Sequence, residues 1–250
     1  MKIFLTLSKI SAAVLLLLLG ACDSDESKDT SSLIFKFTAK AEDELLVFGS
    51  KKYTTPLQQS ITIERLDFYL SNIQIKDAKS DTYYSEPDSY RLLSFDQDQA
   101  TVTFMVENIP ADFEISEIKM AIGVDSEANT SIDHVGDLDP TNGMAWDWNT
   151  GYKFLSLEGR YFDGNNELGQ EIKMHIGTDK NYAPVSLTFD EPFKIVGAFT
   201  LVYAVDALAP FGTVDLEEGT VFMNDERGDQ VALDYRNHLL LIEETFGFVK

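Results

Sequence analysis

Two tryptophans, Trp146 and Trp148, have the most unusual setting in this sequence. They are the only tryptophans of the 250-residue chain, and they lie in "DLDPTNGMAWDWNTGYKF" (137–154), which is rich in Asp, Asn and Gly. Residues two apart on a strand share a face, so both indoles can line one pocket. An intact indole offers only an N–H donor, because its nitrogen lone pair belongs to the ring. The pair therefore indicates either part of a binding pocket or aromatic anchors that close one end of the fold.

Soft metal donors occur in and near the same segment. Met144 carries a thioether two residues before Trp146, and His175 lies in the strand-like stretch "EIKMHIG". Imidazole and thioether donors suit Cu(I) better than they suit Ca²⁺ or Mg²⁺. Taken by itself, His175 is interpreted as a solvent-side strand residue that bonds to a neighbour. His134 and His238 are interpreted as a loop residue and a surface residue.

Hard oxygen donors precede the tryptophans in "DLDPTN". Asp137, Asp139 and Asn142 lie within six residues, and such oxygens on an extracellular loop can bind calcium. The alternative is an Asx-type turn ahead of Pro140, in which the side chains bond to backbone N–H groups. The stretch lacks the full EF-hand pattern, and the turn is the favoured interpretation.

Catalytic motifs are missing from the sequence. It contains no nucleophile elbow, P-loop, GxGxxG, HExxH or CxxC. Carboxylates are abundant in any acidic chain, so their presence does not support a glycosidase. With 42 acidic against 20 basic residues, the formal net charge is −22, which disfavours nucleic acid as a partner. The chain is therefore predicted to be a binding protein rather than an enzyme.

The first 21 residues are typical of a secretory signal, because two lysines precede a short apolar run. The run ends in "LGAC", which resembles the lipobox of bacterial lipoproteins, and Cys22 is the only cysteine. Residues 22–32 follow as an acidic flexible tether, similar to the surface-export signal of lipoproteins in Bacteroidetes-type bacteria. We expect a lipid anchor at Cys22 that holds the protein on the outer membrane, facing the periplasm or the cell surface.

Alternating apolar residues predict that 33–250 is one all-β domain, an antiparallel β-sandwich with Greek-key-like connections. The stretch 61–77 changes phase at Ser71-Asn72, which predicts a bulge. The stretch 193–208 is apolar on both faces, as a central strand would be. Apolar spacings of three and four predict a short C-terminal helix over 234–246. The long loop 123–146 is of the kind that often carries function.

The segment 123–159, "GVDSEANTSIDHVGDLDPTNGMAWDWNTGYKFLSLEG", resembles the signature of the MbnP-like copper-binding proteins. Three other stretches agree with that family, namely "ITIERLDFYLSNIQI", "YRLLSFD" and "IKMHIG". The likeness spans 33–250, and 137–159 is its most specific part. It implies a protein that captures or stores copper and that has a di-haem peroxidase as its partner.

In that family, copper is bound by histidines and by a tryptophan that has been oxidised to kynurenine. Opening the indole ring releases an aryl amine, so a side chain without a free lone pair becomes a nitrogen donor. The resemblance therefore implies a copper site near Trp146, Trp148 and His175, and His175 is the best ligand candidate because it lies in the matching stretch "IKMHIG". The chain departs from the family's pattern by its shortage of histidine.

A cell-surface interaction lipoprotein without a metal is the alternative function. In that case Trp146, Trp148 and Tyr152 would form a platform for stacking on a glycan or for contacting a protein. A third possibility is a sandwich stiffened by Ca²⁺ with a structural role.

Overall fold

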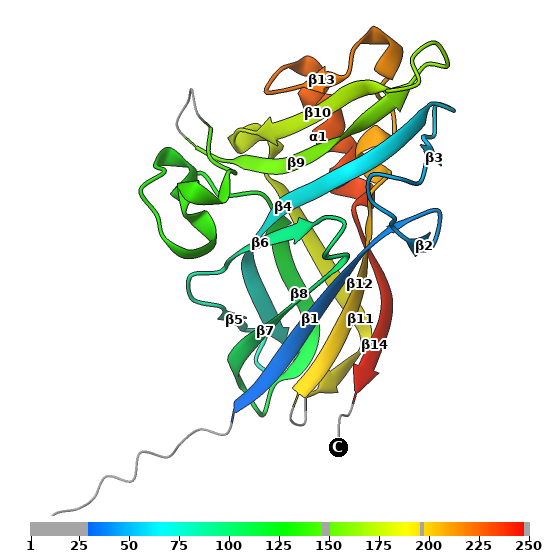
Figure 1. The fold of residues 1–250 in the computed structure, drawn as a ribbon. Helices are drawn as coiled ribbons and strands as arrows, with labels where there is room; N and C mark the ends of the chain where they lie inside the picture. The colour runs from blue at the N-terminus through cyan, green and yellow to red at the C-terminus, as the bar shows by residue number, and fades with distance from the viewer. Residues whose placement is uncertain (1–29, 147–150, 196–197, 248–250) are drawn as a thin grey trace, which may run out of the picture.

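The computed structural model describes residues 30–146, 151–195 and 198–247 (Figure 1). Trp148 and the Cys22 tether therefore lie outside the described residues. No helix in the described part of the chain is long and apolar enough to cross a membrane. The elements in chain order are β1 (Thr30–Ala41), β2 (Glu44–Leu45), β3 (Tyr53–Thr54), β4 (Ser60–Asp77), β5 (Tyr83–Ser85), β6 (Tyr90–Phe95), β7 (Thr101–Pro110), β8 (Glu114–Ile122), β9 (Lys153–Phe162), β10 (Gln170–Gly177), β11 (Ala183–Lys194), β12 (Ala198–Asp206), β13 (Val221–Phe222), α1 (Glu226–His238) and β14 (Leu240–Gly247).

The smaller sheet has the order β14-β12-β1-β2. Strand β2 pairs with Lys40 and Ala41 of β1, and β7 pairs with residues 30–38 of the same strand. Its central strand β12 is the doubly apolar stretch of the sequence, although the predicted single strand over 193–208 is divided between β11 and β12. The β1–β12 pair is parallel, as is β10–β13. The predicted β-sandwich is confirmed, but its sheets are mixed rather than wholly antiparallel, because long connections allow distant strands to pair in parallel.

The larger sheet has the order β11-β8-β4-β9-β10-β13, and the short strands β3, β5 and β6 also pair with β4. Strand β4 bends near its middle, where its register against β8 shifts between Ser71 and Gln74. Asn72 has a positive φ of 56° at this point, which is the conformation of a bulge residue. The bulge predicted at Ser71-Asn72 is therefore confirmed.

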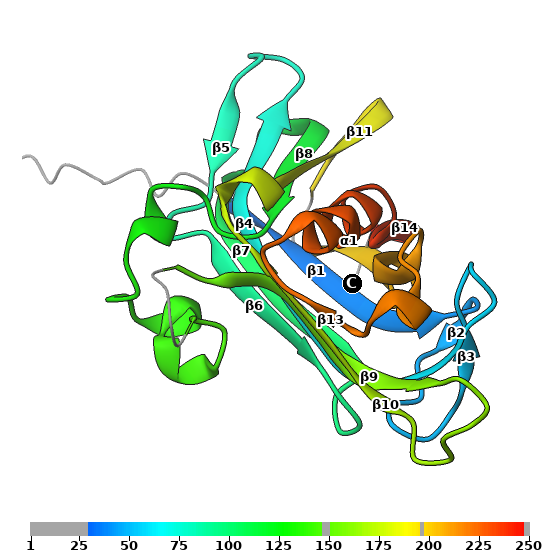
Figure 2. The same cartoon turned by 90° about the horizontal axis from the view of Figure 1, so that it is seen from above.

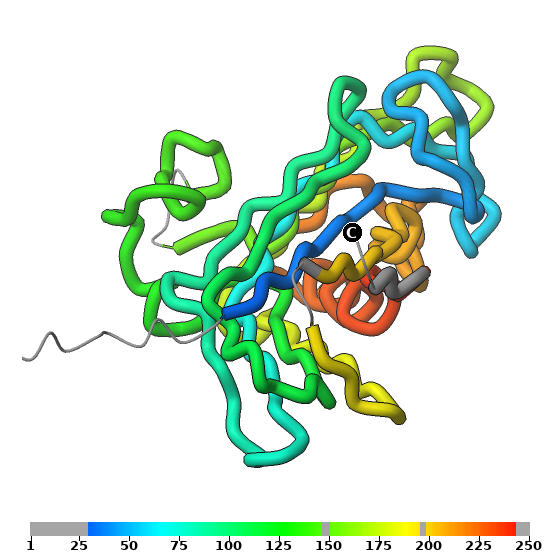
Figure 3. The backbone as a smooth tube through the Cα atoms, turned by 90° about the horizontal axis from the view of Figure 1, so that it is seen from below, coloured from blue at the N-terminus to red at the C-terminus, as the bar shows by residue number. Residues whose placement is uncertain are grey.

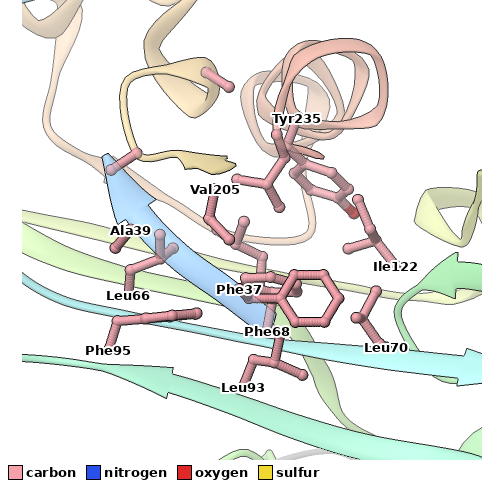
Figure 4. Packing of buried hydrophobic residues seen from close by; sticks show 14 of the residues in the cluster. Phe37, Ala39, Leu66, Phe68, Leu70, Leu93, Phe95, Ile122, Val205 and Tyr235 are labelled. Carbon is pink, nitrogen blue, oxygen red and sulfur yellow. The ribbon is translucent and has the colours of Figure 1, made fainter. Parts of the chain in front are cut away.

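The main core lies between the sheets and is closed at one side by the helix (Figure 4). Phe37 of β1 and Phe68 of β4 have no exposed surface, and they come from opposite sheets. Tyr235 of α1 is also fully buried, and its hydroxyl donates to the Asn181 carbonyl oxygen at 2.8 Å. The alternating strand patterns thus place their apolar faces toward one shared core.

The helix begins earlier than the apolar spacing predicted. The Asp225 side chain accepts a hydrogen bond from the Gly228 amide at 2.9 Å and caps the first turn of α1. The helix ends at His238, and residues 240–247 form β14 along the edge of β12. The predicted bounds 234–246 were wrong because the edge of β12 provides backbone partners for a segment whose side-chain spacing alone resembles a helix.

The segment 123–146 projects from the sandwich on the side away from β2 and β3, as Figures 2 and 3 show. It contains three short 3-10 turns at Ala128–Thr130, Gly136–Leu138 and Pro140–Asn142. A second buried cluster joins it to the outer face of the larger sheet. The members of this second cluster are Tyr69, Val124, Ala128, Leu138, Met144, Tyr152 and Phe154.

Candidate functional site

Trp146 is buried where the projecting segment returns to the larger sheet. Its side chain is 5% exposed, and its Nε1–H donates to the backbone carbonyl oxygen of Tyr152 at 3.0 Å. Its backbone amide donates to the Gly151 carbonyl oxygen at 3.1 Å, and Ala145 forms an isolated bridge with Tyr152. Hydrogen bonds from the backbone amide and from the ring nitrogen therefore both hold Trp146 in place.

The indole lies against Gly177 at the end of β10. A Cβ built on Gly177 would be 3.1 Å from Trp146 Nε1 and 2.4 Å from the Tyr152 carbonyl oxygen. Only glycine leaves room for this approach. His175 lies two residues earlier on β10, so it shares a face of the strand with the position that Trp146 covers. The structure thus brings Trp146 and His175 to the same face of one strand end.

His175 is held as a neutral imidazole beside a carboxylate. Its side chain is 15% exposed, and Nε2 lies 3.3 Å from Glu158 Oε1 of β9. Burial lowers the pKa of His175, and the charge of Lys153 lowers it further against the opposing effect of Glu158. When Nε2–H donates to the carboxylate, Nδ1 keeps a free lone pair. Metal-binding histidines commonly use this arrangement.

Lys153 is a cation whose charge acts on His175 and whose ammonium lies near the Trp146 ring. Its ammonium donates to the Gly143 carbonyl oxygen at 2.9 Å and lies 6.0 Å from the centre of the Trp146 ring. The backbone of Lys153 pairs with Gly177, which fixes it at the same strand end. Sequence reasoning missed Lys153 and Glu158, because only the β9–β10 register places them beside His175.

A polar row continues from His175 across the larger sheet. His175 is opposite Ser156 of β9, and Ser156 is opposite Asp67 of β4. Asp67 is 2% exposed and accepts a hydrogen bond from Arg65 Nε at 2.5 Å. Burial raises the pKa of this carboxyl, while Arg65 opposes the shift. The ion pair of Asp67 and Arg65 therefore lies two strands away from His175, at the other end of this row.

Met144 lies in the second cluster. Its side chain is 1% exposed and is packed among the apolar and aromatic residues of that cluster. Its carbonyl oxygen accepts a hydrogen bond from the Lys153 amide at 2.7 Å. The structure thus uses Met144 as a packing residue, and nothing places its sulfur beside His175.

The carboxylates of "DLDPTN" bond to the protein itself. Asp139 Oδ1 accepts from the Thr141 amide at 2.8 Å and from its hydroxyl at 2.6 Å. These bonds, the side-chain one first, lower the pKa of Asp139. Asp137 Oδ2 accepts from the Leu92 amide at 2.9 Å, and Asn142 Nδ2 donates to the Gly136 and Asp137 carbonyl oxygens. Asp139 therefore caps a turn and Asp137 ties the segment to β6, and calcium binding stays a prediction.

The two remaining histidines are distributed as the sequence suggested. His134 Nε2 lies 3.1 Å from the Ala128 carbonyl oxygen inside the projecting segment. It lines a hollow of about 620 Å³ together with Tyr90, Arg91 and Asp137. His238 is the exposed last residue of α1. Neither imidazole is placed on the face that Trp146 and His175 share.

The fit of a copper ion can be tested on the donors present. His175 Nδ1 is a suitable nitrogen ligand, whereas the Trp146 nitrogen donates its hydrogen to Tyr152 and gives no lone pair. Among the described residues, no three His, Cys, Asp or Glu side chains gather in a group that could hold a metal ion. Among the described residues the site therefore offers copper one imidazole donor, and a second nitrogen would come only from an opened indole ring.

A stacking platform is not available at the same place. Trp146 is 5% exposed and Tyr152 has no exposed surface, so neither ring offers a face to a sugar. The hydroxyl of Tyr152 donates to the Leu138 carbonyl oxygen at 2.7 Å and fixes the ring in the second cluster. Burial of both rings removes the physical basis for the glycan alternative at these two residues.

Comparison with known proteins finds a family model and a solved structure that are similar to this chain. The family model described as MbnP matches residues 30–225, which is most of the chain. Among solved structures, MbnP from Methylosinus trichosporium is similar, with 14% identity and a TM-score of 0.49, over 80% of this chain and 83% of that chain. No curated protein matches the chain.

Proposed function

The chain belongs to the MbnP family, and from that premise we propose that it binds copper at the face shared by Trp146 and His175. It would capture or store the ion rather than catalyse a reaction. The observation that supports this proposal is the contact between the Trp146 indole and Gly177, two residues beyond His175. His175 would supply one nitrogen donor to a soft cation, and the Trp146 nitrogen would become a second donor only after its ring had been opened.

The proposed location is the cell envelope. A lipid on Cys22 would anchor the chain, and the residues before β1 would act as a tether. Extended chain covers about 3.3–3.6 Å per residue, so the domain could stand some tens of ångströms from the bilayer. Such a position would give the copper site access to ions outside the cytoplasm.

The second nitrogen donor is proposed to come from Trp146 after oxidation. A peroxide-dependent di-haem partner could cleave the C2–C3 bond of the indole, with two equivalents of peroxide leaving as water. Hydrolysis of the resulting formyl amide would release formate and free the aryl amine. Nε1 of Trp146 lies against Gly177, two residues beyond His175, which supports Trp146 as the residue modified.

Intact mass and metal content of the protein purified from its own host test the proposal. We expect the peptide that contains Trp146 to differ from its calculated mass by the tryptophan-to-kynurenine increment, and copper to co-purify. Unmodified tryptophans together with protein that retains no copper would contradict it.

A histidine variant locates the site. His175→Asn should lower the copper content of the purified protein severalfold, because it removes the imidazole on the face shared with Trp146. His238→Asn is the matched control, since His238 is exposed at the end of α1. Equal copper loss in both variants would move the site away from Trp146.

A further inference from the structure

Thr178, directly after the strand end that Trp146 covers, has a backbone conformation that L residues rarely adopt. Its φ of 72° and ψ of 146° lie close to the region that is populated almost only by glycine. Its side chain is also β-branched, which makes a positive φ costlier still. Such a conformation persists only where the surrounding structure over-determines it. The turn after β10 is therefore held by its neighbours.

Two asparagines bond to the two backbone polar groups of Gly177, the residue against which the indole lies. Asn224 Oδ1 accepts from the Gly177 amide at 2.9 Å, and Asn181 Nδ2 donates to the Gly177 carbonyl oxygen at 2.9 Å. Asn181 is 3% exposed, and its Nδ2 also donates to Asp229 Oδ1 of α1 at 3.2 Å. The peptide groups on both sides of Gly177 are therefore fixed by side chains from outside β9 and β10.

Asn224 is brought to this place by β13 and α1. Strand β13 pairs in parallel with β10 (Figure 1), and Asn224 lies between β13 and α1, directly before the helix cap Asp225. The first turn of α1 packs on the same strand, since a Cβ built on Gly228 would be 3.3 Å from Ile176 Cδ1. Asn224 Nδ2 is buried and has no hydrogen-bond partner among the described residues. In this part of the structure, Asn224 therefore acts through its oxygen.

We propose that Asn224 is a positioning residue that holds Gly177 where the Trp146 indole can lie against it. It thereby sets the place of the ring relative to His175. This inference rests on the proposed function and adds a residue from outside the two strands of the site. A Cβ built on Gly177 would be 2.4 Å from the Tyr152 carbonyl oxygen, which is the acceptor of the indole N–H. A displaced Gly177 would therefore disturb the hydrogen bond that seats the ring.

Solvent exchange of the Trp146 indole N–H tests the positioning and requires no copper. It is followed by heteronuclear NMR in a Trp148→Phe background, on full-length protein whose remaining indole is intact. In Asn224→Ala we expect roughly tenfold faster exchange, because the Gly177 amide loses its acceptor. Asn224→Asp keeps an acceptor oxygen, and the start of a helix favours its negative charge, so slow exchange should be retained. Asn237→Ala is the matched control, since that side chain bonds within α1, and it should change nothing.

Copper content and kynurenine mass of the protein purified from its own host give the second readout. Asn224→Ala should lower both severalfold, and Asn224→Asp should retain both. If the wild type shows neither copper nor kynurenine, the proposed function fails, while faster indole exchange in Asn224→Ala alone still supports the positioning role.

Three results would overturn the inference. The first is indole exchange in Asn224→Ala at the wild-type rate. The second is an equal loss of protection in Asn224→Ala and Asn224→Asp, because the acceptor oxygen would then not be what matters. The third is an equal acceleration of the backbone amides in the core strands, because the asparagine would then support the whole fold rather than the place of the ring.

Discussion

At the residue scale, the Trp146 ring combines apolar burial with a single directed hydrogen bond. The side chain is 5% exposed, and Nε1 donates to the Tyr152 carbonyl oxygen. A buried carbonyl that loses its donor costs free energy as well as packing. Trp146 Nε1 therefore matters both to the local fold and to the proposed copper site. Variants at this position must be judged by stability as well as by copper content.

We predict that Trp146→Ala lowers the free energy of unfolding by about 3–5 kcal/mol, because it removes a large buried ring. Trp146→Phe keeps most of the apolar volume and should cost less, about 1–3 kcal/mol, from the unpaired Tyr152 carbonyl. Urea unfolding followed by far-UV circular dichroism measures both. Equal stability of Trp146→Ala and the wild type would contradict the buried placement of the ring.

Asp77 provides a residue-scale prediction about pH. Burial raises the pKa of its carboxyl, but hydrogen bonds from the Ser80 side chain and from the Glu114 and Ser80 amides outweigh that effect and lower the pKa to about 2. Because the folded-state pKa is below the ordinary 3.8, the carboxylate stabilises the fold above about pH 4. This contribution is lost as the pH falls from about 4 to about 2.

Asp77→Asn should therefore lower the free energy of unfolding by roughly 1–3 kcal/mol at pH 7 and by much less near pH 2. Urea unfolding at several pH values measures the difference. Asp98→Asn is the control, since Asp98 is exposed in a turn and its amide bonds to Asp96. A cost for Asp77→Asn that is constant down to pH 2 would contradict the assigned hydrogen bonds.

At the element scale, the pairing of β9 and β10 positions the site. The register shifts between Ile176 and Gly177, so Gly177 pairs with Lys153 and Phe154 is skipped. This irregularity brings the start of β9 and the returning segment over the end of β10. The proximity of Trp146 and His175 was predictable from the family resemblance. The neighbours Glu158 and Lys153 were not, because cross-strand pairing is invisible in a single sequence.

We predict that Gly177→Ala displaces the indole. The new Cβ would be 2.4 Å from the Tyr152 carbonyl oxygen and 3.1 Å from Trp146 Nε1, and a backbone carbonyl cannot move aside as a flexible side chain can. The expected cost is about 1–3 kcal/mol, together with a red-shifted Trp146 emission in a Trp148→Phe background. An unchanged emission maximum and unchanged stability would show that the ring does not contact Gly177.

Local pattern predicted the strands well and the helix poorly. Alternation identified β1, β4, β7, β8, β10 and β11, because each has one face on the core. The helix was displaced in the prediction because Leu239 and Ile242 have helical spacing. Leu240–Gly247 instead pairs with β12, and a tertiary partner of this kind outweighs local propensity.

At the whole-molecule scale, the last strand completes the smaller sheet. β14 covers one edge of β12, while β1 covers the other edge. The parallel β1–β12 pair joins the two ends of the domain, so folding requires residues far apart in the chain to meet. Sequence alone did not indicate this, since parallel pairing of distant strands leaves no local pattern.

We predict that a chain ending at residue 239 folds poorly. Loss of β14 would expose the backbone edge of β12, which is a template for aggregation. The truncated protein should lose its cooperative thermal transition or elute as aggregate in size-exclusion chromatography. A chain ending at residue 247 is the control and should remain monodisperse. Cooperative unfolding of the shorter chain at the wild-type temperature would contradict the assigned role of β14.

X-ray absorption at the copper edge tests the central claim most directly. For the natively purified protein, the account predicts nitrogen ligands with the multiple-scattering signature of one imidazole, and it predicts that His175→Asn removes that signature. The same imidazole signature in wild type and His175→Asn would place copper elsewhere in the protein and would contradict the assignment.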